Sequence, residues 1–309
     1  MLDALKIKKD FPIFNNHQEL IYLDNAATSQ KPQIVIDRIV KFYSNENANV
    51  HRGVYPLSEQ ASEAYDLARQ AVANFIGAKT GKEIIFTKGT TESLNLVAQS
   101  FALESLKNGD EVLVADFEHH SNFLPWQMVC QKTGTSLKIL NSDESGFISQ
   151  KEWQNKLNKK TKIVAIAHAS NVLGTINDIK KIAEMVHNVG AVLVVDGAQA
   201  VPHLSVNMQD LDCDFYTFSG HKMLGPMGIG VLYVKETILA KMFPYQLGGG
   251  MIESVSMDKT IYASYPEKFE AGTPNVEGAT TLVEAINYLS KIGLAEIRAH
   301  EIKLSEYLL

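Results

Sequence analysis

The sequence predicts an α/β protein whose mainly parallel sheet carries helices on both faces. Short apolar runs alternate with helical segments between residues 83 and 234. Runs such as KIVAIAHA (162–169) and VLVVDGAQ (192–199) are nearly continuous in Val, Ile, Leu and Ala, which is typical of strands buried on both faces. Strands and helices that alternate in this way favour a parallel sheet covered on both sides. In such sheets, functional groups gather in the loops after the carboxyl ends of the strands.

Each element follows from the spacing of its apolar residues. Residues 33–76 are expected to be mostly helical, because Ala61, Tyr65, Ala68 and Val72 recur at three- and four-residue steps. We expect strands at 83–87, 111–115, 136–140, 162–169, 192–199, 215–219 and 228–234. We expect helices at 91–105, near 122–133, at 149–158 and at 178–188, and a final helical pair over 278–309.

The composition argues against several classes of protein. Of the 309 residues, 45% are hydrophobic and 21% are charged, as in an ordinary globular protein. The formal net charge of −6 argues against general binding to nucleic acid or to anionic membranes, which favours a basic surface. The opening residues contain no apolar signal-peptide core, and no apolar run approaches the roughly 18 residues of a membrane span. Two cysteines, Cys130 and Cys213, are too few for a disulfide framework, so we expect a reducing compartment and a cytoplasmic protein.

The end of the chain departs from the pattern of a finished domain. The helical pair over 278–309 has neither a C-cap signal nor a polar tail. We therefore expect the chain to be cut, with an N-terminal segment and large domain over 1–280 and only the start of a smaller C-terminal domain over 281–309. The helical pair should then expose an apolar face.

Two loops after predicted strands carry residues suited to an anion and to a cation. Thr90 and Thr91 open a helix after strand 83–87, and the free amides of a helix start favour an anion, although ordinary capping by threonine is the simpler alternative. Asp196 stands at the end of an apolar strand, where a carboxylate is costly without a positive partner. A capping aspartate, or a metal ligand together with His203, is the alternative there.

A third loop holds Lys222 in the stretch FSGHKMLGPMG, just after strand 215–219. An amine held among such groups can lose its proton and attack a carbonyl, whereas an ordinary surface lysine is the alternative. Pyridoxal phosphate would explain all three loops at once, because it has a carbonyl for the lysine, a pyridine nitrogen for the aspartate and a phosphate for the helix start.

Two further strand-end loops fit the same cofactor. His119 and His120 follow strand 111–115, and one of them could stack on the pyridine ring and move protons. The alternative is a hydrogen-bonded structural histidine. Asn171 follows strand 162–169 and could contact the ring oxygen or the substrate.

The chain resembles a group II cysteine desulfurase of the SUF type, a fold-type-I pyridoxal-phosphate enzyme related to class-V aminotransferases. The resemblance rests on YLDNAATSQKP, VHRGVYPLSEQA, GTTESLNLVA, EHHSNFLPWQ, SNVLGT, VDGAQAVPH, LDCDFYTFSGHKMLGPMGIG and FEAGTPN. It implies cleavage of L-cysteine to L-alanine, with the sulfur passed on as a persulfide for iron–sulfur cluster assembly. L-selenocysteine is a second candidate substrate. The implied partners are a second copy of the chain, as a homodimer, and a SufE- or SufU-type sulfur acceptor.

The resemblance also implies roles for individual residues. Lys222 forms the Schiff base, Asp196 pairs with the pyridine nitrogen, and Gln199 contacts the ring oxygen. His119 stacks on the ring, and Asn171 lies near the substrate.

The implied phosphate site draws on several loops and on two subunits. Thr91, Ser219 and His221 hold the phosphate, with Thr90 adjacent. The FEAGTPN loop reaches the partner subunit's site, so that Thr273 would bind phosphate across the homodimer. The segment QLGGGMIESVSMDKT resembles a glycine-rich lid near the site mouth.

One part of the family pattern has no match. Its cysteine nucleophile and its substrate-binding arginine belong to a C-terminal domain, and neither is found here. Cys130 and Cys213 lie on a predicted helix and strand edge, where small buried cysteines are common, so neither suits the role. Three interpretations follow: a cysteine desulfurase whose nucleophile lies in a missing C-terminal segment, a selenocysteine lyase, and a truncated chain that binds pyridoxal phosphate without turnover.

Overall fold

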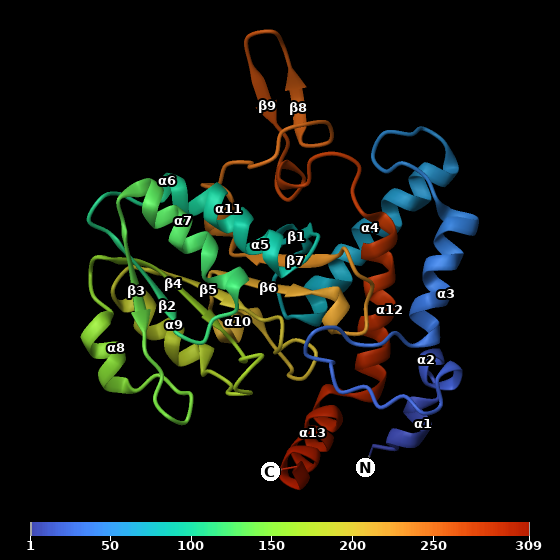
Figure 1. Ribbon diagram of the computed structural model, residues 1–309. Helices are drawn as coiled ribbons and strands as arrows, with labels where there is room; N and C mark the ends of the chain where they lie inside the picture. The colour runs from blue at the N-terminus through green and yellow to red at the C-terminus, as the bar shows by residue number, and fades with distance from the viewer. Residues whose placement is uncertain (1, 309) are drawn as a thin grey trace.

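A seven-stranded sheet forms the centre of the protein, in the order β1-β7-β6-β5-β4-β2-β3 (Figure 1). The computed structural model describes residues 2–308. Only β7 runs antiparallel to its neighbours β1 and β6, and the other described pairs of this sheet are parallel. The predicted fold class, α/β with a mainly parallel sheet and helices on both faces, is confirmed. The strands are β1 Ile84–Thr87, β2 Glu111–Ala115, β3 Ser136–Leu140, β4 Thr161–Ala167, β5 Val192–Asp196, β6 Phe215–Ser219 and β7 Gly230–Val234.

Helices pack on both faces because alternate residues of each strand enter two different cores. In β5, Leu193 and Val195 join the core with α4, α9 and α12, whereas Val194 joins the core with α5, α7 and α11. No helix of the described chain combines the length and apolarity that a membrane span needs. The helices are α1 Ala4–Lys8, α2 Pro12–Asn16, α3 Gln33–Lys41, α4 Pro56–Phe75, α5 Thr90–Val97, α6 Leu103–Ser105, α7 Leu124–Thr133, α8 Gln150–Lys156, α9 Ile179–Asn188, α10 Met208–Leu211, α11 Glu236–Leu239, α12 Val276–Ile292 and α13 Leu294–Leu308.

Several predicted element boundaries differ from the structure by one to three residues. The strand expected over 192–199 ends at Asp196, because the chain turns there and Ala200 N donates to Gly197 O at 2.9 Å. The helix expected at 91–105 is a run of α5, a π-helical turn over Ala98–Ala102, and α6. A hairpin of β8 (Ile252–Val255) and β9 (Thr260–Tyr262), which the sequence did not predict, projects from the body (Figure 1).

The two C-terminal helices have different surroundings. The expected domain boundary at 280/281 falls inside α12, where Ala279 and Leu282 on either side are fully buried in the core that also contains residues of α4. Along its described length, α13 has no buried residue, and its Ile302 and Leu304 are 41% and 48% exposed. The exposed apolar side chains of this helical pair therefore include Ile302 and Leu304 of α13. The division of the chain into two domains stays a prediction.

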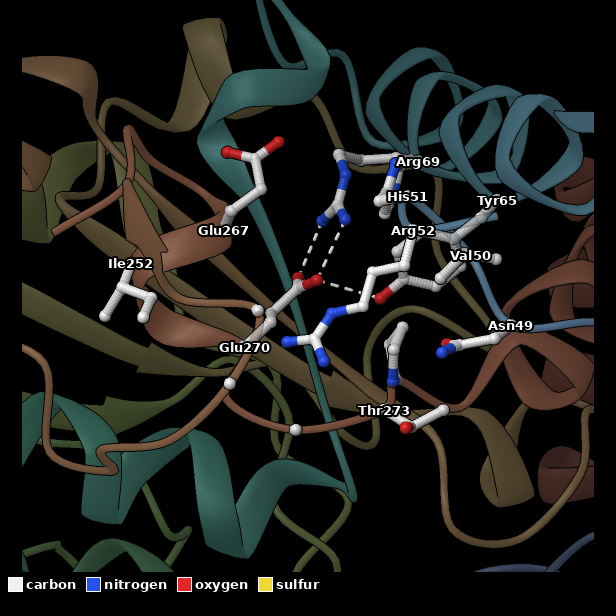
Figure 2. Close-up of a pocket in the computed structure, with 14 residues that line it drawn as sticks. Asn49, Val50, His51, Arg52, Tyr65, Arg69, Ile252, Glu267, Glu270 and Thr273 are labelled. Atoms are coloured by element: carbon white, nitrogen blue, oxygen red, sulfur yellow. Dashed lines mark hydrogen bonds and ion pairs between the residues drawn. The ribbon is translucent and has the colours of Figure 1, made fainter. Parts of the chain in front are cut away.

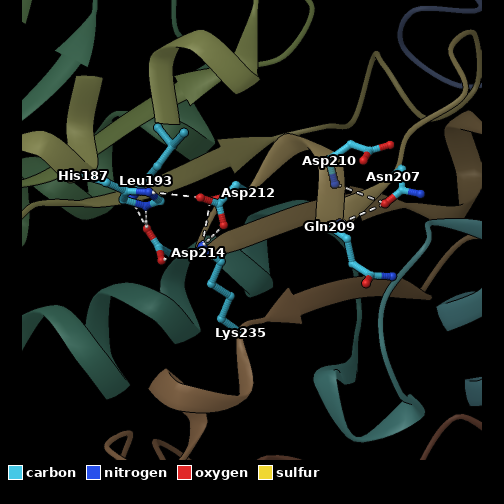
Figure 3. A network of polar contacts seen from close by, with 8 residues as sticks. All are labelled: His187, Leu193, Asn207, Gln209, Asp210, Asp212, Asp214 and Lys235. Atoms are coloured by element: carbon cyan, nitrogen blue, oxygen red, sulfur yellow. Dashed lines mark hydrogen bonds and ion pairs between the residues drawn. The ribbon is translucent and has the colours of Figure 1, made fainter. Parts of the chain in front are cut away.

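A charged cluster joins β5, β6, β7 and α9 at the end of the sheet where strand β6 begins (Figure 3). Asp214 accepts a hydrogen bond from Leu193 N at 2.8 Å and pairs with His187 Nε2 at 2.8 Å. Lys235, directly after β7, pairs with Asp212 Oδ1 at 2.6 Å and with Asp214 Oδ1 at 3.5 Å. These contacts hold the strands together at the end opposite to the carboxyl ends of the parallel strands.

A second polar cluster lies buried between α4, β1 and the segment before α12 (Figure 2). Arg69 donates two hydrogen bonds to Glu270, at 2.7 and 2.9 Å, and both side chains are 8% exposed. The same carboxylate accepts hydrogen bonds from the Tyr65 hydroxyl at 2.8 Å and from Phe86 N at 2.7 Å. The buried charge of Glu270 is therefore fully hydrogen-bonded, and it anchors the segment that follows to the body of the protein.

We expect Glu270→Ala to lower the free energy of unfolding by about 3–5 kcal/mol, because it leaves the buried charge of Arg69 without its partner. Urea unfolding followed by circular dichroism measures this loss. As a control, Lys41→Ala removes a 64% exposed partner of Glu46 and should cost less than about 1 kcal/mol. Equal losses in the two variants would contradict a buried anchor at Glu270.

Candidate functional site

The predicted site residues meet at the carboxyl ends of the parallel strands. A cavity of about 530 Å³ lies beside the ends of β4, β5 and β6, the start of α5 and the N-terminal residues Asp24, Ala26 and Ala27. Nine of the ten predicted site residues line it: Thr90, Thr91, His119, Asn171, Asp196, Gln199, Ser219, His221 and Lys222. The tenth, Thr273, lies elsewhere.

The amine of Lys222 has no bonding partner among the described residues. It ends a single 3₁₀ turn, Gly220–Lys222, that follows β6 directly. Within residues 2–308 the amine forms no hydrogen bond or ion pair. Burial lowers the pKa of this amine, and the negative charge of Asp196 opposes that shift. A larger fraction of Lys222 is therefore uncharged near neutral pH than of an ordinary surface lysine, and an uncharged amine can attack a carbonyl.

Asp196 presents a carboxylate with one free side. The residue is 6% exposed, and its Oδ1 accepts a hydrogen bond from Ala198 N at 2.9 Å. No described residue bonds its second oxygen. Burial raises the pKa of this carboxyl group, whereas the Ala198 N–H and the positive charges of Lys222 and His119 lower it. A buried carboxylate of this kind is stabilised by a cation or by a protonated ring nitrogen in the cavity.

The start of α5 supplies hydrogen-bond donors for an anion. The first N–H groups of a helix have no intrahelical acceptor, and they carry the positive end of the helix dipole. Ser219 bridges this start to β6, because its hydroxyl accepts a bond from Thr90 N at 2.8 Å and contacts Thr90 Oγ1 at 2.9 Å. Thr91 Oγ1 meets Ser121 Oγ at 2.7 Å. Capping by threonine, the alternative considered from the sequence, is wrong, since the N-cap is Gly89 and has no side chain.

The close approach of two backbones brings this helix start to the end of β6. Gly230 opens β7 and pairs with both Thr87 of β1 and Ser219 of β6. A Cβ atom at position 230 would lie 2.3 Å from the Cα of Gly89. Only glycine therefore fits at position 230, and this contact fixes the distance between the α5 start and the lysine turn.

The two adjacent histidines have different surroundings. His119 lines the cavity, whereas His120 is not among the described residues that do. His119 Nδ1 accepts a hydrogen bond from Ser121 N at 3.1 Å, so its Nε2 carries the proton of the neutral ring. Partial burial, helped by the positive charge of Lys222, lowers the pKa of His119 and favours this neutral form. His119 can therefore contact a bound ring and donate a proton from Nε2.

The remaining polar residues border the cavity from three loops. Gln199 Nε2 donates to Ala26 O at 2.7 Å, which leaves its second N–H and the side-chain oxygen for a ligand. His221 Nδ1 meets Thr28 Oγ1 at 3.2 Å, and burial with the nearby charge of Lys222 lowers the pKa of its ring. Asn171 is exposed at the mouth of the cavity.

Thr273 lines a separate cavity of about 450 Å³, next to the buried Arg69–Glu270 pair (Figure 2). The structure therefore does not bring it to the nine other predicted residues of its own chain. The role that the resemblance implies for Thr273, in the partner subunit's site, stays a prediction.

Sequence reasoning missed two contributions to the site. The N-terminal segment from Asp24 to Ala27 forms a wall of the cavity, although it has no periodicity that would predict its place. Glu118 was also missed; it accepts hydrogen bonds from Ala167 N at 2.7 Å and from Asn122 Nδ2 at 2.6 Å, which ties the loop with His119 to the end of β4. Burial raises the pKa of Glu118 to about 8. The two hydrogen bonds lower this pKa, and the negative charge of Asp196 raises it by a smaller amount than burial does.

The residues of the cavity fit pyridoxal phosphate. An unpaired amine at Lys222, a half-bonded buried carboxylate at Asp196 and a helix start with hydroxyl groups face one space. They match the three polar parts of that cofactor, namely its carbonyl, its ring nitrogen and its phosphate. His203, which a metal site would have required, pairs with Glu301 of α13 at 2.5 Å.

The comparisons with known proteins agree with this chemistry. The aminotransferase class-V family matches residues 21–309. A probable cysteine desulfurase of Halalkalibacterium halodurans is 48% identical over 100% of this chain and 77% of its own length. The cysteine desulfurase of Synechococcus elongatus is 45% identical over 98% of this chain but only 49% of its own length. The chain thus spans between about half and three quarters of the length of these relatives.

Solved structures of cysteine desulfurases share the fold. The apo structure of the enzyme from Thermococcus onnurineus NA1 has a TM-score of 0.94 at 42% identity, over 99% of this chain and 76% of that chain. CsdA from Escherichia coli has a TM-score of 0.88 at 38% identity, over 96% of this chain and 74% of that chain. A more distant likeness, at 21% identity and a TM-score of 0.83, is to a C-DES variant with glycine linked to its PLP cofactor, over 97% of this chain and 78% of that chain. The match covers nearly all of the sequence and all parts of the cavity, and the chain therefore belongs to the aminotransferase class-V family, among the cysteine desulfurases.

Proposed function

We propose that the protein is a pyridoxal-phosphate-dependent cysteine desulfurase, which converts L-cysteine to L-alanine and transfers the sulfur as a persulfide. The observation that carries the proposal is the unpaired amine of Lys222 in one cavity with the half-bonded carboxylate of Asp196. The identity of 45–48% to cysteine desulfurases supports the choice of substrate.

The chain would hold the cofactor at three points. The start of α5, with Thr91 and Ser219, would bind the phosphate through N–H and hydroxyl donors. Asp196 would face the ring nitrogen and keep a proton on it, and Lys222 would bond to the carbonyl carbon. When bound, pyridoxal phosphate supplies an electron sink for the charge that develops at the α-carbon of the substrate.

Lys222 and His119 are well placed to move protons in this cavity. Because the pKa of Lys222 is lowered, its Nζ can accept the α-proton of cysteine once the amine is free. His119 Nε2 can donate a proton to an atom of the substrate, because its Nδ1 already accepts a hydrogen bond from Ser121 N and the ring proton is on Nε2. At the border of the cavity, Gln199 would contact the ring oxygen of the cofactor and Asn171 would lie near the substrate.

Neither cysteine of the described chain suits the sulfur-accepting step. That step requires a thiolate that attacks the sulfur of the substrate, while the carbon–sulfur bond breaks and its electron pair stays with the carbon. Cys213 is fully buried and Cys130 is 5% exposed, and burial raises the pKa of both thiols, that of Cys130 to about 11. We therefore assign this thiolate to a cysteine outside residues 2–308, in agreement with the C-terminal nucleophile of the family pattern.

The finer assignments follow the resemblance. We infer a cytoplasmic homodimer, in which Thr273 and its cavity serve the partner subunit's site. Exposed apolar side chains, such as Val54 at 97% and Leu23 at 89%, support burial against a second copy. We further infer transfer of the sulfur to a SufE- or SufU-type acceptor of the SUF system for iron–sulfur cluster assembly, and L-selenocysteine as a second substrate.

We expect the full-length gene product, loaded with pyridoxal phosphate, to release L-alanine from L-cysteine. Lys222→Ala should lower this rate roughly 10²–10⁴-fold or more, because the proton-moving amine is lost. Alanine is measured by amino-acid analysis, and the covalent link to the cofactor by mass spectrometry after borohydride reduction. Lys132→Ala, at an exposed position of α7, is the matched control. A fully active Lys222→Ala variant would rule the mechanism out, and cofactor binding without alanine would favour the non-catalytic interpretation.

The pH dependence of Lys222 in the cofactor-free protein tests its pairing with Asp196. The carboxylate of Asp196 raises the pKa of the amine, so Asp196→Asn should shift the midpoint of Lys222 labelling by an amine reagent to lower pH. The labelled fraction is read by peptide mass spectrometry. Asp258→Asn, in the exposed β8–β9 turn, should leave the midpoint unchanged. A midpoint that stays or rises in Asp196→Asn would contradict the pairing.

The two cysteines should react slowly with iodoacetamide in the folded protein at pH 8, because their thiols are buried and carry raised pKa values. Unfolding in urea should make both react at the rate of a free thiol. Detection of substrate sulfur on Cys130 or Cys213 by mass spectrometry after turnover would overturn the assignment of the nucleophile to another segment.

A further inference from the structure

The backbone carbonyl next to Lys222 is held by the N-terminal segment. His221 O lies within hydrogen-bond distance of Ser29 N and Ser29 Oγ, both at 3.0 Å, and of Thr28 Oγ1 at 3.2 Å. Lys31 Nζ donates to the same oxygen at 3.0 Å. These donors lie about 190 residues away in the sequence, so only the fold brings them to the lysine turn.

Lys31 is the strongest donor of this group. A carbonyl oxygen has two lone pairs, so the four donors compete for it. The two hydroxyl groups each have a second contact: Ser29 Oγ also accepts from Leu224 N at 2.9 Å, and Thr28 Oγ1 also meets His221 Nδ1 at 3.2 Å. Only Lys31 can bring a positive charge: burial lowers the pKa of its amine to about 8, so most of it is protonated at pH 7, and charge-assisted hydrogen bonds are the stronger ones. Its amine also donates to Ser29 O, which fixes its direction.

The lysine turn needs such support because it is short. Gly220 O accepts bonds from Met223 N at 3.0 Å and Gly225 N at 2.9 Å, which closes the turn on itself. Leu224, directly after it, has a φ of 66°, in the left-handed region that disfavours a leucine. The contacts of Ser29 and Lys31 at His221 O and Leu224 N therefore hold both sides of the peptide that carries Lys222.

We propose that Lys31 is a positioning residue for Lys222: its hydrogen bond to His221 O sets the backbone of the lysine turn, and with it the place of the Lys222 amine opposite Asp196. The inference rests on the proposed function only in taking Lys222 as the cofactor lysine. Lys31 itself does not line the cavity among the described residues, so it acts through the peptide that it holds.

The variants Lys31→Met and Lys31→Arg, with Lys132→Met as a matched control on exposed α7, test the proposal. The first readout is hydrogen exchange of the cofactor-free protein, followed by mass spectrometry. In Lys31→Met we expect exchange over residues 219–226 to rise roughly 10-fold, while exchange in β4 stays unchanged. Lys31→Arg should restore most of the protection, because a guanidinium can donate to the same oxygen, and Lys132→Met should match the wild type.

The second readout is the Kd for pyridoxal phosphate, followed by the absorbance of the bound cofactor. We expect Lys31→Met to weaken binding roughly 10-fold and Lys31→Arg to recover most of it. Unchanged exchange over 219–226, an equal rise across the whole sheet, or no recovery in Lys31→Arg would each overturn the positioning role. Wild-type protein that binds no pyridoxal phosphate would contradict the proposed function instead, and the exchange result would still decide on Lys31.

Discussion

The site depends on two opposite charges, on Asp196 and Lys222, that share one cavity without forming an ion pair with each other. Burial raises the pKa of the carboxyl group and lowers that of the amine, while each charge favours the charged form of the other. A direct ion pair would have occupied both groups. Because they are held apart, each can face a third molecule, and a ligand with a carbonyl group and a basic ring nitrogen meets both requirements.

The separation of these charges is set by the backbone rather than by the side chains. Asp196 and Ser219 end neighbouring parallel strands, and Gly230 brings the end of β1 against the end of β6 through its contact with Gly89. The charged cluster around Asp214 holds the same strands at their other end. The buried Arg69–Glu270 pair anchors the segment before α12. The contact of Gly230 with Gly89 is the one among these that lies next to the cavity, and its loss would move the α5 start relative to the lysine turn.

The described chain has the parts for binding a cofactor and for moving a proton, but its cysteines are placed as core residues. The thiols of Cys130 and Cys213 are buried and carry raised pKa values, so neither of them suits the sulfur-accepting step of the proposed function. The two cysteine desulfurase relatives compared above are longer than this chain, which covers 77% and 49% of their lengths. In the proposed function, cofactor binding and sulfur acceptance are therefore carried by different parts of the protein.

The sequence alone was enough to predict the strands of the central sheet, the fold class and the loops with Asp196 and Lys222, because runs of buried residues and the polar residues that follow them are local features. Nine of the ten predicted residues meet in one cavity for the same reason, since the carboxyl ends of parallel strands share one edge of the sheet. Only the tertiary structure decided that β7 runs antiparallel between β1 and β6, that Thr273 lies in a separate cavity, and that Lys31 contacts His221. These features depend on pairings between segments far apart in the sequence, whose closeness is set by the packing of the whole chain and not by the pattern of any one segment.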